Sequence, residues 1–344
     1  MAIPGWTRTE SPFHAGELAI QGRMGTQAQM DRQGRQLIRE YLPDQFRQFF
    51  AQLPYIIVGT VDAAGSLWAS ILVGEPGFLS SPDDLTLQVA AKPLFGDPLN
   101  TTLAAGIDIG LLGIELHTRR RNRLNGKVTA IDSDRFEVNV GQSFGNCPKY
   151  IQARMFELIE QDSATPRSLH QFQMLGTAER AVIAIADTCF IATAYQNASA
   201  GIASGVDVSH RGGKPGFVRL DDDDTLTVPD FSGNCQFNTF GNLELNPCAG
   251  LLFVDFDRGN LLYLTGTAEV IWEGAEINEY EGAERLFRFH LDRGYRVEGS
   301  LPLRWSSPVF SPFLAHTGSW WVNDSFNISY ERDNCVAFTT LKPI

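Results

Sequence analysis

The chain lacks several features that would assign it to a common functional class. Its 344 residues contain no HExxH or GxxxxGK[ST] motif, so metalloprotease and nucleoside-triphosphatase activities lose their usual support. No window approaches the roughly 18 apolar residues that span a bilayer. The N-terminus lacks the basic and apolar regions of a signal peptide. We therefore expect a cytoplasmic protein with no membrane partner.

Cysteine and positive charge are also scarce. The five cysteines are scattered and form no CxxC pair, so neither a disulfide framework nor a metal site is supported. Lysine and arginine number 28 against 40 aspartates and glutamates, which gives a net charge of −12. Because nucleic-acid binding depends on basic residues that neutralise phosphates, we expect no nucleic-acid partner. Any local cluster of basic residues therefore stands out.

The pattern that is present is mostly that of short strands. Residues 1–26 are rich in Gly, Pro and Thr and predict an extended arm, and residues 28–52 predict two helices separated by Pro43. Apolar, β-branched runs follow, and they favour antiparallel β structure. The strands that we expect in this half span 55–61, 67–73, 86–90, 109–116, 122–131 and 135–140.

Short motifs of the first half recur in the second half at an offset of about 140 residues. Pro76-Gly77-Phe78 recurs as Pro215-Gly216-Phe217, and Thr86-Leu87 recurs as Thr225-Leu226. Gly110-Leu111-Leu112 recurs as Gly250-Leu251-Leu252, and the pair Leu124 and Gly126 recurs as Leu264 and Gly266. This predicts a tandem duplication. We expect an arm and helices in 1–50, a β domain in 51–155, a linker helix and second β domain in 156–305, and a tail in 306–344.

The stretch 205–242 of the second copy contains the strongest candidate site. It predicts a strand, a glycine-rich polar loop, a strand, an acidic turn, a strand and a second polar turn that opens a helix near Ser232-Gly233-Asn234. If the strands pair antiparallel, the two turns converge on one anionic ligand, because helix N-termini favour phosphate. The alternative is an ordinary hairpin loop with soluble side chains. The polar residues concerned are His210, Arg211, Lys214, Ser232 and Asn234.

The two copies differ in ways that point to one composite site. If Ser70 is aligned with Ser204 and Phe78 with Phe217, the second copy has five extra residues between these anchors. We assign the extra residues to the region of His210 and Arg211. Only the first copy has a basic cluster, at 117–123. We interpret Arg119 and Arg120 as a solvated hairpin tip, whereas Arg121 and Arg123 share one face of a strand and suggest an anionic partner. We therefore expect one principal ligand per chain, bound between unlike halves.

Longer motifs carry a family resemblance. DVS-x-RG-x-x-PGFV at 207–218, PD-x-x-GN-x-x-x-[DN]T-x-x-N at 229–242, NP-x-x-GLLF at 246–253 and G-x-A at 266–268 resemble the pyridoxamine 5′-phosphate oxidase-like FMN-binding proteins. TRRRNRLNG at 118–126 and QSFGNCPKYIQ at 142–152 look like their tandem-barrel, predicted flavin-nucleotide-binding branch. The resemblance implies a mainly β fold with flanking helices, in which two tandem split β-barrels form a pseudo-dimer around FMN.

The resemblance also assigns flavin contacts residue by residue. Relatives often place an arginine after the Gly-Asn pair, where this chain has Cys235-Gln236, so we expect more reliance on other basic residues. Contacts to the isoalloxazine edge and phosphate are implied for Val208, Ser209, His210 and Arg211, with Lys214 as a further cation. The turn around the ribityl phosphate is implied for Pro229, Asp230, Ser232, Gly233, Asn234 and Asn238. From the opposing barrel come Arg121, Arg123, Gln142, Ser143 and Lys149.

The resemblance implies a cofactor more directly than a reaction. It suggests an FMN-dependent oxidoreductase with an unidentified substrate, and a reductase or other electron-donor protein and a second copy of the chain as partners. A non-catalytic flavin-binding or electron-transfer module is the alternative, and a barrel that has lost its flavin is a third. No acid–base pair is evident, and His210 is expected to bond cofactor or solvent. Residues 325–344 predict a terminal strand pair, or resemble the opening of a ferredoxin-reductase-type domain.

Overall fold

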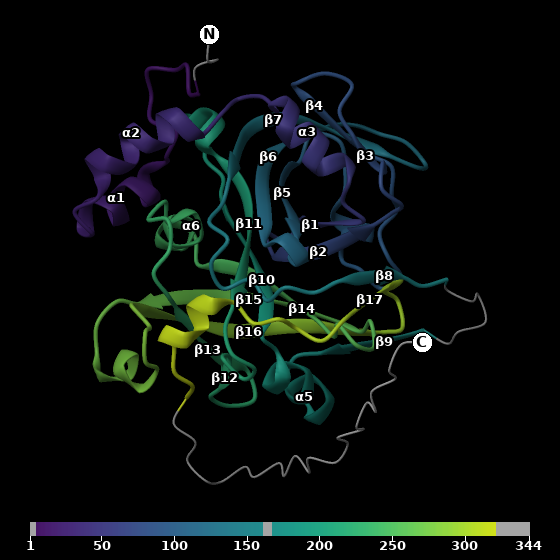
Figure 1. The fold of residues 1–344 in the computed structure, drawn as a ribbon, viewed down its shortest axis with the longest axis vertical. Coiled ribbons are helices and arrows are strands. Elements are labelled where there is room, and N and C mark those ends of the chain that lie inside the picture. Colours follow the sequence, from purple (N-terminus) through teal and green to yellow (C-terminus); the bar gives the residue numbers. More distant parts are fainter. Residues whose placement is uncertain (1–4, 161–166, 321–344) are drawn as a thin grey trace, which may run out of the picture.

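Two antiparallel sheets dominate the computed structural model, which describes residues 5–160 and 167–320 (Figure 1). The seven-stranded first sheet has the order β2-β1-β5-β6-β7-β4-β3. Its strands are β1 (Tyr55–Val61), β2 (Leu67–Val73), β3 (Leu79–Ser80), β4 (Thr86–Val89), β5 (Asp108–Glu115), β6 (Arg120–Ile131) and β7 (Phe136–Gly145). The expected strands of this half are therefore present, with shifts at their ends.

The eight-stranded second sheet repeats that order as β11-β10-β14-β15-β16-β13-β12, with β9 added on β16. Its strands are β9 (Ser168–Phe172), β10 (Thr188–Tyr195), β11 (Gly205–Gly212), β12 (Arg219–Leu220), β13 (Thr225–Asp230), β14 (Cys248–Val254), β15 (Leu261–Ile271) and β16 (Arg285–Glu298). A separate pair joins β8 (Phe156–Leu158) to β17 (Leu303–Trp305). The prediction of a mainly β fold is confirmed, and the strand order is consistent with a split-barrel-like fold.

Apolar side chains form one core under each sheet and a third between the sheets. Phe136 belongs to the first core and Phe287 to the second, while Trp68 and Phe190 lie in the shared core. The recurring glycines explain how the sheets approach. A Cβ on Gly110 of β5 would lie 2.6 Å from the Val206 carbonyl oxygen, and one on Gly250 of β14 would lie 2.3 Å from that of Leu67. Only glycine allows this contact.

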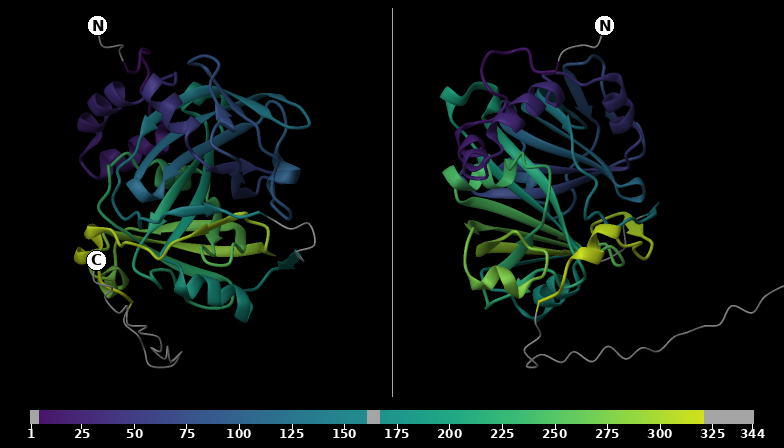
Figure 2. Two further views of the ribbon diagram at one scale, coloured as in Figure 1. Left: turned by 45° about the vertical axis from the view of Figure 1, so that its right-hand side comes forward. Right: turned by 60° about the vertical axis from the view of Figure 1, so that its left-hand side comes forward.

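Helices flank the sheets (Figure 2). They are α1 (Ala15–Arg23), α2 (Gln27–Leu37), α3 (Asp44–Ala51), α4 (Leu99–Thr102), α5 (Thr177–Ile185) and α6 (Asn238–Leu245), with short 3-10 turns at Leu116–Thr118, Ala198–Ala203, Ala275–Glu279 and Pro312–His316. The break at Pro43 between α2 and α3 is confirmed. Within the described residues, no helix combines the length and apolar character that crossing a bilayer requires.

The expectation of an extended arm over residues 1–26 is wrong, because α1 lies within it. The helix starts after His14, whose imidazole accepts a hydrogen bond from the Gly16 N–H, while the Glu17 carboxylate accepts one from the His14 N–H. This reciprocal capping satisfies N–H groups that the helix leaves free. A polar linker expected at 161–167 lies outside the described residues except for Arg167, and so does the strand pair expected at 325–344.

The placement of the extra residues of the second copy is also wrong. β11 pairs along its whole length with β10, and Val208 lies opposite Ala192 as Ala69 lies opposite Gly59. Ser209, not Ser204, therefore corresponds to Ser70. The added length lies in the connection 196–204, which replaces the shorter turn 62–66. His210 and Arg211 are strand residues, and the offset of 139 between Phe78 and Phe217 likewise pairs Ser70 with Ser209.

Candidate cofactor site

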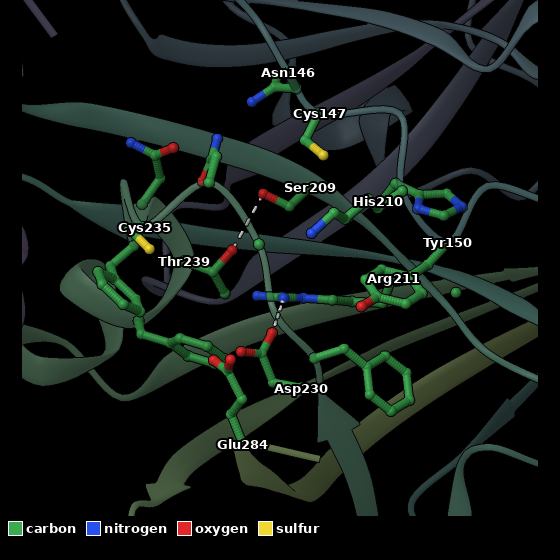
Figure 3. Close-up of a pocket in the computed structure, with 18 of the residues that line it drawn as sticks. Asn146, Cys147, Tyr150, Ser209, His210, Arg211, Asp230, Cys235, Thr239 and Glu284 are labelled. Atoms are coloured by element: carbon green, nitrogen blue, oxygen red, sulfur yellow. Dashed lines mark hydrogen bonds and ion pairs between the residues drawn. The ribbon is translucent and has the colours of Figure 1, made fainter. Parts of the chain in front are cut away.

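A cavity with about 910 Å³ of empty space, part of it open to solvent, lies between the two halves (Figure 3). The β6 strand of the first sheet contributes Arg121 and Arg123, and β11 of the second sheet contributes residues 209–212. The end of β13, the following turn and the start of α6 form another wall. One cavity is thus shared by segments that lie far apart in sequence.

Most residues that the resemblance assigned to the flavin line this cavity. We expected the strands that carry these residues to pair directly, but β11 and β13 are not neighbours in the sheet. The two strands meet because the second sheet curves, so that Arg211 on the edge strand β11 binds Asp230 on β13. The assigned residues that line the cavity are Arg121, Arg123, Lys149, Ser209, His210, Arg211, Pro229, Asp230, Gly233, Asn234 and Asn238.

Five assigned residues lie elsewhere. Val208 is buried in the core between the sheets. The Gln142 side-chain amide donates a hydrogen bond to the Pro12 carbonyl oxygen, and the Ser143 hydroxyl donates to that of Tyr41, so both hold the N-terminal segment. Lys214 Nζ donates to the Thr317 carbonyl oxygen, and Ser232 is exposed. None of the five lines the cavity.

Of the two arginines expected at a solvated tip, Arg119 departs from the prediction and Arg120 agrees with it. Arg119 has a positive φ of 59° and donates hydrogen bonds to the carbonyl oxygens of Ile151 and Val309, so it ties two chain segments together. Arg120 is exposed, as expected, with its guanidinium over the Phe49 ring. The prediction for Arg119 is therefore wrong, because carbonyl groups from distant segments reach it.

A buried ion pair joins the two sheets at the cavity wall. Arg123 Nη1 donates to Asp207 Oδ1 at 2.7 Å, and Arg123 Nη2 donates to the Ser209 hydroxyl. Asn125 and Asn242 donate to the two oxygens of the same carboxylate, at 2.7 and 2.9 Å. Because a buried charge is costly unless it is paired, this network fixes Arg123 in one position.

A second ion pair lies on the opposite wall. Arg211 binds Asp230, and Arg285 Nη1 lies 3.5 Å from the other oxygen of that carboxylate. Both guanidinium groups also contact the Phe240 ring, with ring-centroid distances of 4.8 and 6.0 Å. Burial raises the pKa of Asp230, although both arginines oppose that shift. Arg285 and Cys235 thus both line the cavity.

Arg121 differs from these arginines because no carboxylate of the described residues pairs with it. Its Nε donates to the Cys147 carbonyl oxygen at 2.7 Å, and its guanidinium faces the cavity. Burial, together with the nearby Arg123 and Arg211, lowers the pKa of Arg121 to about 10, while Cys147 opposes that shift. An uncompensated cation among cations is unfavourable unless an anion joins it.

The cavity as a whole has an excess of positive charge. Four arginines and Lys149 line it, against the carboxylates of Asp230 and Glu284. Burial, and then the charges of Arg121, Arg211 and Arg154, lower the pKa of His210 well below its usual value, so the imidazole is neutral at pH 7. Its Nε2 has no hydrogen-bond partner in the described part of the chain. The cavity therefore offers positive charge.

Backbone geometry adds further donors. The helix begins at Asn238, later than the predicted 232–234, and no side chain caps it, so its first-turn N–H groups are available beside the cavity. Tyr150, Cys235 and Phe237, which all line the cavity, have φ values of 62°, 59° and 62°. Such conformations are costly for residues other than glycine, and they concentrate at functional sites.

Several cavity residues were not singled out from the sequence. Arg285 lies opposite Asp230 in the pairing of β16 with β13, so it could be found only once that register was known. Thr239, whose hydroxyl donates to that of Ser209 at 3.1 Å, follows Asn238 within the family motif and could have been named from it. The other lining residues that were missed are Asn146, Cys147, Tyr150, Gly212, Phe231, Cys235, Phe237, Phe240 and Glu284.

No family model and no curated protein matches the chain. Among solved structures, HupZ of Group A Streptococcus is similar at 20% identity and TM-score 0.29, over 37% of this chain and 98% of HupZ. A candidate pyridoxamine 5′-phosphate oxidase from Lactobacillus delbrueckii is similar at 12% identity and TM-score 0.28, over 36% and 94% of the two chains. An FAD-binding protein from Mesorhizobium loti gives 12% identity and TM-score 0.26, over 38% and 99%. The fold assignment here depends on strand order and register.

Proposed function

We propose that the chain is an FMN-binding flavoprotein that holds one flavin phosphate in the cavity between its halves. The observation that carries this proposal is Arg121, a half-buried guanidinium with no carboxylate partner in the described chain, beside an uncapped helix N-terminus. A phosphate dianion would balance both, because helix N-termini and charge-assisted hydrogen bonds favour it. The family motifs select a flavin nucleotide from among phosphate ligands.

The residues present fit such a ligand. Arg121, Arg211, Arg285 and the first-turn N–H groups of α6 would hold the phosphate. Bound FMN would supply electron transfer to or from a substrate or partner protein. FMN is favoured over FAD because the motifs resemble FMN-binding proteins.

The equal strand order of the two sheets supports two further proposals. The halves derive from a tandem duplication, with barrel domains at 51–155 and 156–305, and they form an internal pseudo-dimer. A single flavin per chain follows, because basic residues line the shared cavity on one side of that pseudo-dimer only.

Titration with FMN, FAD and riboflavin tests the proposal, with flavin fluorescence as the readout. We expect FMN to saturate at one per chain and to bind far more tightly than riboflavin, since riboflavin lacks the phosphate. Equal affinity for FMN and riboflavin, or two equal FMN sites per chain, would overturn it.

A second experiment separates the oxidoreductase from a flavin carrier. The FMN-loaded protein is mixed with NADH or NADPH, and bleaching of the flavin absorbance is followed before acceptors are screened. We expect an oxidoreductase, which is reduced and passes electrons to a small acceptor. A protein that is reduced only by another flavoprotein would instead be an electron-transfer module.

A further inference from the structure

A buried polar network lies behind the cavity and reaches it from the N-terminal helix. Asn238, the first residue of α6, donates to Glu17 Oε1, and the His14 N–H donates to Glu17 Oε2 at 2.9 Å. On the cavity side, Asp207 binds Arg123. The exposed fractions are 5% for His14, 4% for Glu17, 7% for Asp207 and 2% for Arg123. Two carboxylates and one guanidinium are therefore enclosed together.

Close packing fixes α1 against α6 (Figure 1). A Cβ on Gly16 would lie 2.0 Å from the Gly241 carbonyl oxygen, and one on Gly241 would lie 2.5 Å from Glu17 Cγ. Gln21 also donates to the Gln236 carbonyl oxygen at 3.2 Å. The α1 helix thus supports both the first turn of α6 and the residues before it, which form one wall of the cavity.

The charge balance of this network depends on Glu17. Burial, and then the charge of Asp207, raise the pKa of Glu17 to about 8, although hydrogen bonds from His14 and Asn238 and the charge of Arg123 oppose this shift. Burial lowers the pKa of His14, against Asp207 and Asn242, and the Tyr195 ring stacks on the imidazole at 4.8 Å. At pH 7 Glu17 therefore keeps its proton, and Arg123 balances Asp207.

We propose that Glu17 is a positioning residue of the anion site, which holds Asn238 in place and, while it stays protonated, leaves the positive end of α6 available to the ligand phosphate. Ionised Glu17 would place a negative charge at that helix end and compete with the phosphate. By linkage, binding of the anion and loss of this proton oppose each other. This inference rests on the proposed function and adds the N-terminal helix to its site.

The test is FMN affinity measured from pH 7.0 to pH 9.5 in the full chain. We expect the wild-type protein to lose affinity about fivefold as the pH rises through about 8, a size typical of a charge at a helix end. Glu17→Gln keeps an acceptor for Asn238 but cannot ionise, so it should match wild type at pH 7.0 and show no such loss. Glu273→Gln, at an exposed carboxylate, should follow the wild-type curve.

A merely structural role gives a different result. Glu17→Leu removes the acceptor for Asn238 and should weaken FMN binding at every pH. Normal binding by Glu17→Gln at pH 7.0 would show that the lost acceptor, and not misfolding, causes the weaker binding. Circular dichroism checks the fold of each variant. Equal slopes for wild type and Glu17→Gln would overturn the inference while leaving FMN binding intact. If FMN does not bind, the proposed function fails. The same variants are then titrated with sulfate, whose charge is constant over this range, and a pH-independent sulfate affinity would overturn the role of Glu17.

Discussion

The cavity has a counterpart in the other half of the molecule, and the two differ in what fills them. Strand register places Leu261 and Tyr263 of β15 where β6 has Arg121 and Arg123. On the neighbouring strand, Leu72 of β2 stands where β11 has Arg211. All three counterpart residues are buried, at 1% exposure or less. The same strand framework is thus packed with apolar side chains on one side and left open and basic on the other.

An internal carboxylate explains why the counterpart needs no arginine. Asp97 accepts hydrogen bonds from the Ser70 hydroxyl at 2.7 Å, from the Tyr263 hydroxyl at 2.9 Å and from the Leu99 N–H, which begins α4, at 2.7 Å. At the cavity the matching groups are Ser209, Arg123 and the start of α6, where no protein carboxylate caps the helix. The chain supplies its own anion on one side. The other side is therefore suited to the anion of a ligand.

The largest expected effect comes from opening the filled side. Leu261→Ala removes a buried side chain from the core between the sheets, and should lower the free energy of unfolding by about 2–5 kcal/mol in urea denaturation. Ile131→Ala, on a side chain that is 44% exposed, should change it by less than about 0.5 kcal/mol. FMN stoichiometry should stay at one per chain, and a second flavin bound by Leu261→Ala would contradict the comparison.

The carboxylate of Asp97 gives the filled side a pH dependence. Burial raises the pKa of Asp97 to about 6, although Ser70, Leu99, Tyr263 and Ile71 donate to it. A raised pKa means that the folded state binds the proton more tightly, so the stabilisation is complete below the unfolded value and lost as pH rises through about 6. Relative to Asp97→Asn, wild-type stability should fall by about 3 kcal/mol between about pH 4 and pH 6.

Equilibrium unfolding of both proteins at several pH values measures this difference. A difference that rises with pH would show that the hydrogen bonds to Asp97 outweigh its burial and keep the carboxylate ionised. That result would strengthen the view of Asp97 as a permanent internal anion, and it would overturn the predicted direction of the shift.

Arg121→Ala should weaken FMN binding but should not lower the free energy of unfolding. Loss of one charge-assisted contact costs about 1.5–3 kcal/mol, which corresponds to FMN affinity roughly 10- to 150-fold weaker. Stability should not fall, because no carboxylate of the described chain loses a partner. Arg219→Ala, at a half-buried ion pair with Glu276 outside the cavity, is the matched control for binding. Unchanged FMN affinity in Arg121→Ala would place the ligand outside the cavity.

Much of this arrangement could be predicted from the sequence because it depends on local patterns. Apolar runs gave the strands, and the recurring Gly110 and Gly250 mark the close approach of the sheets. The alternation of Arg121 and Arg123 on one strand face was enough to suggest an anion site. These features need only neighbours along the chain or a repeat within it.

The rest depends on contacts between distant residues. Arg285 reaches the cavity through the pairing of β16 with β13, and Glu17 through the packing of α1 on α6. The register of β11 was misjudged because Ser70 was aligned with Ser204, although the offset of 139 between Phe78 and Phe217 identifies Ser209, as the pairing with β10 does. The Gln142 side chain binds the N-terminal segment, and a strand pattern cannot predict such a contact.

The smallest expected effect tests whether Arg285 replaces the arginine that the family often has at position 235. Cys235 has a positive φ of 59° and lines the cavity, so Cys235→Arg would add a cation there without new backbone strain. Because Arg285 is already within 3.5 Å of Asp230 on that wall, the added arginine should raise FMN affinity by no more than about threefold, less than a typical charge-assisted bond provides. Cys235→Ser serves as the neutral control. A gain of about tenfold or more, measured in the same fluorescence titration, would mean that Arg285 does not contact the phosphate and that the cavity holds its ligand with the arginines of β6 and β11 alone.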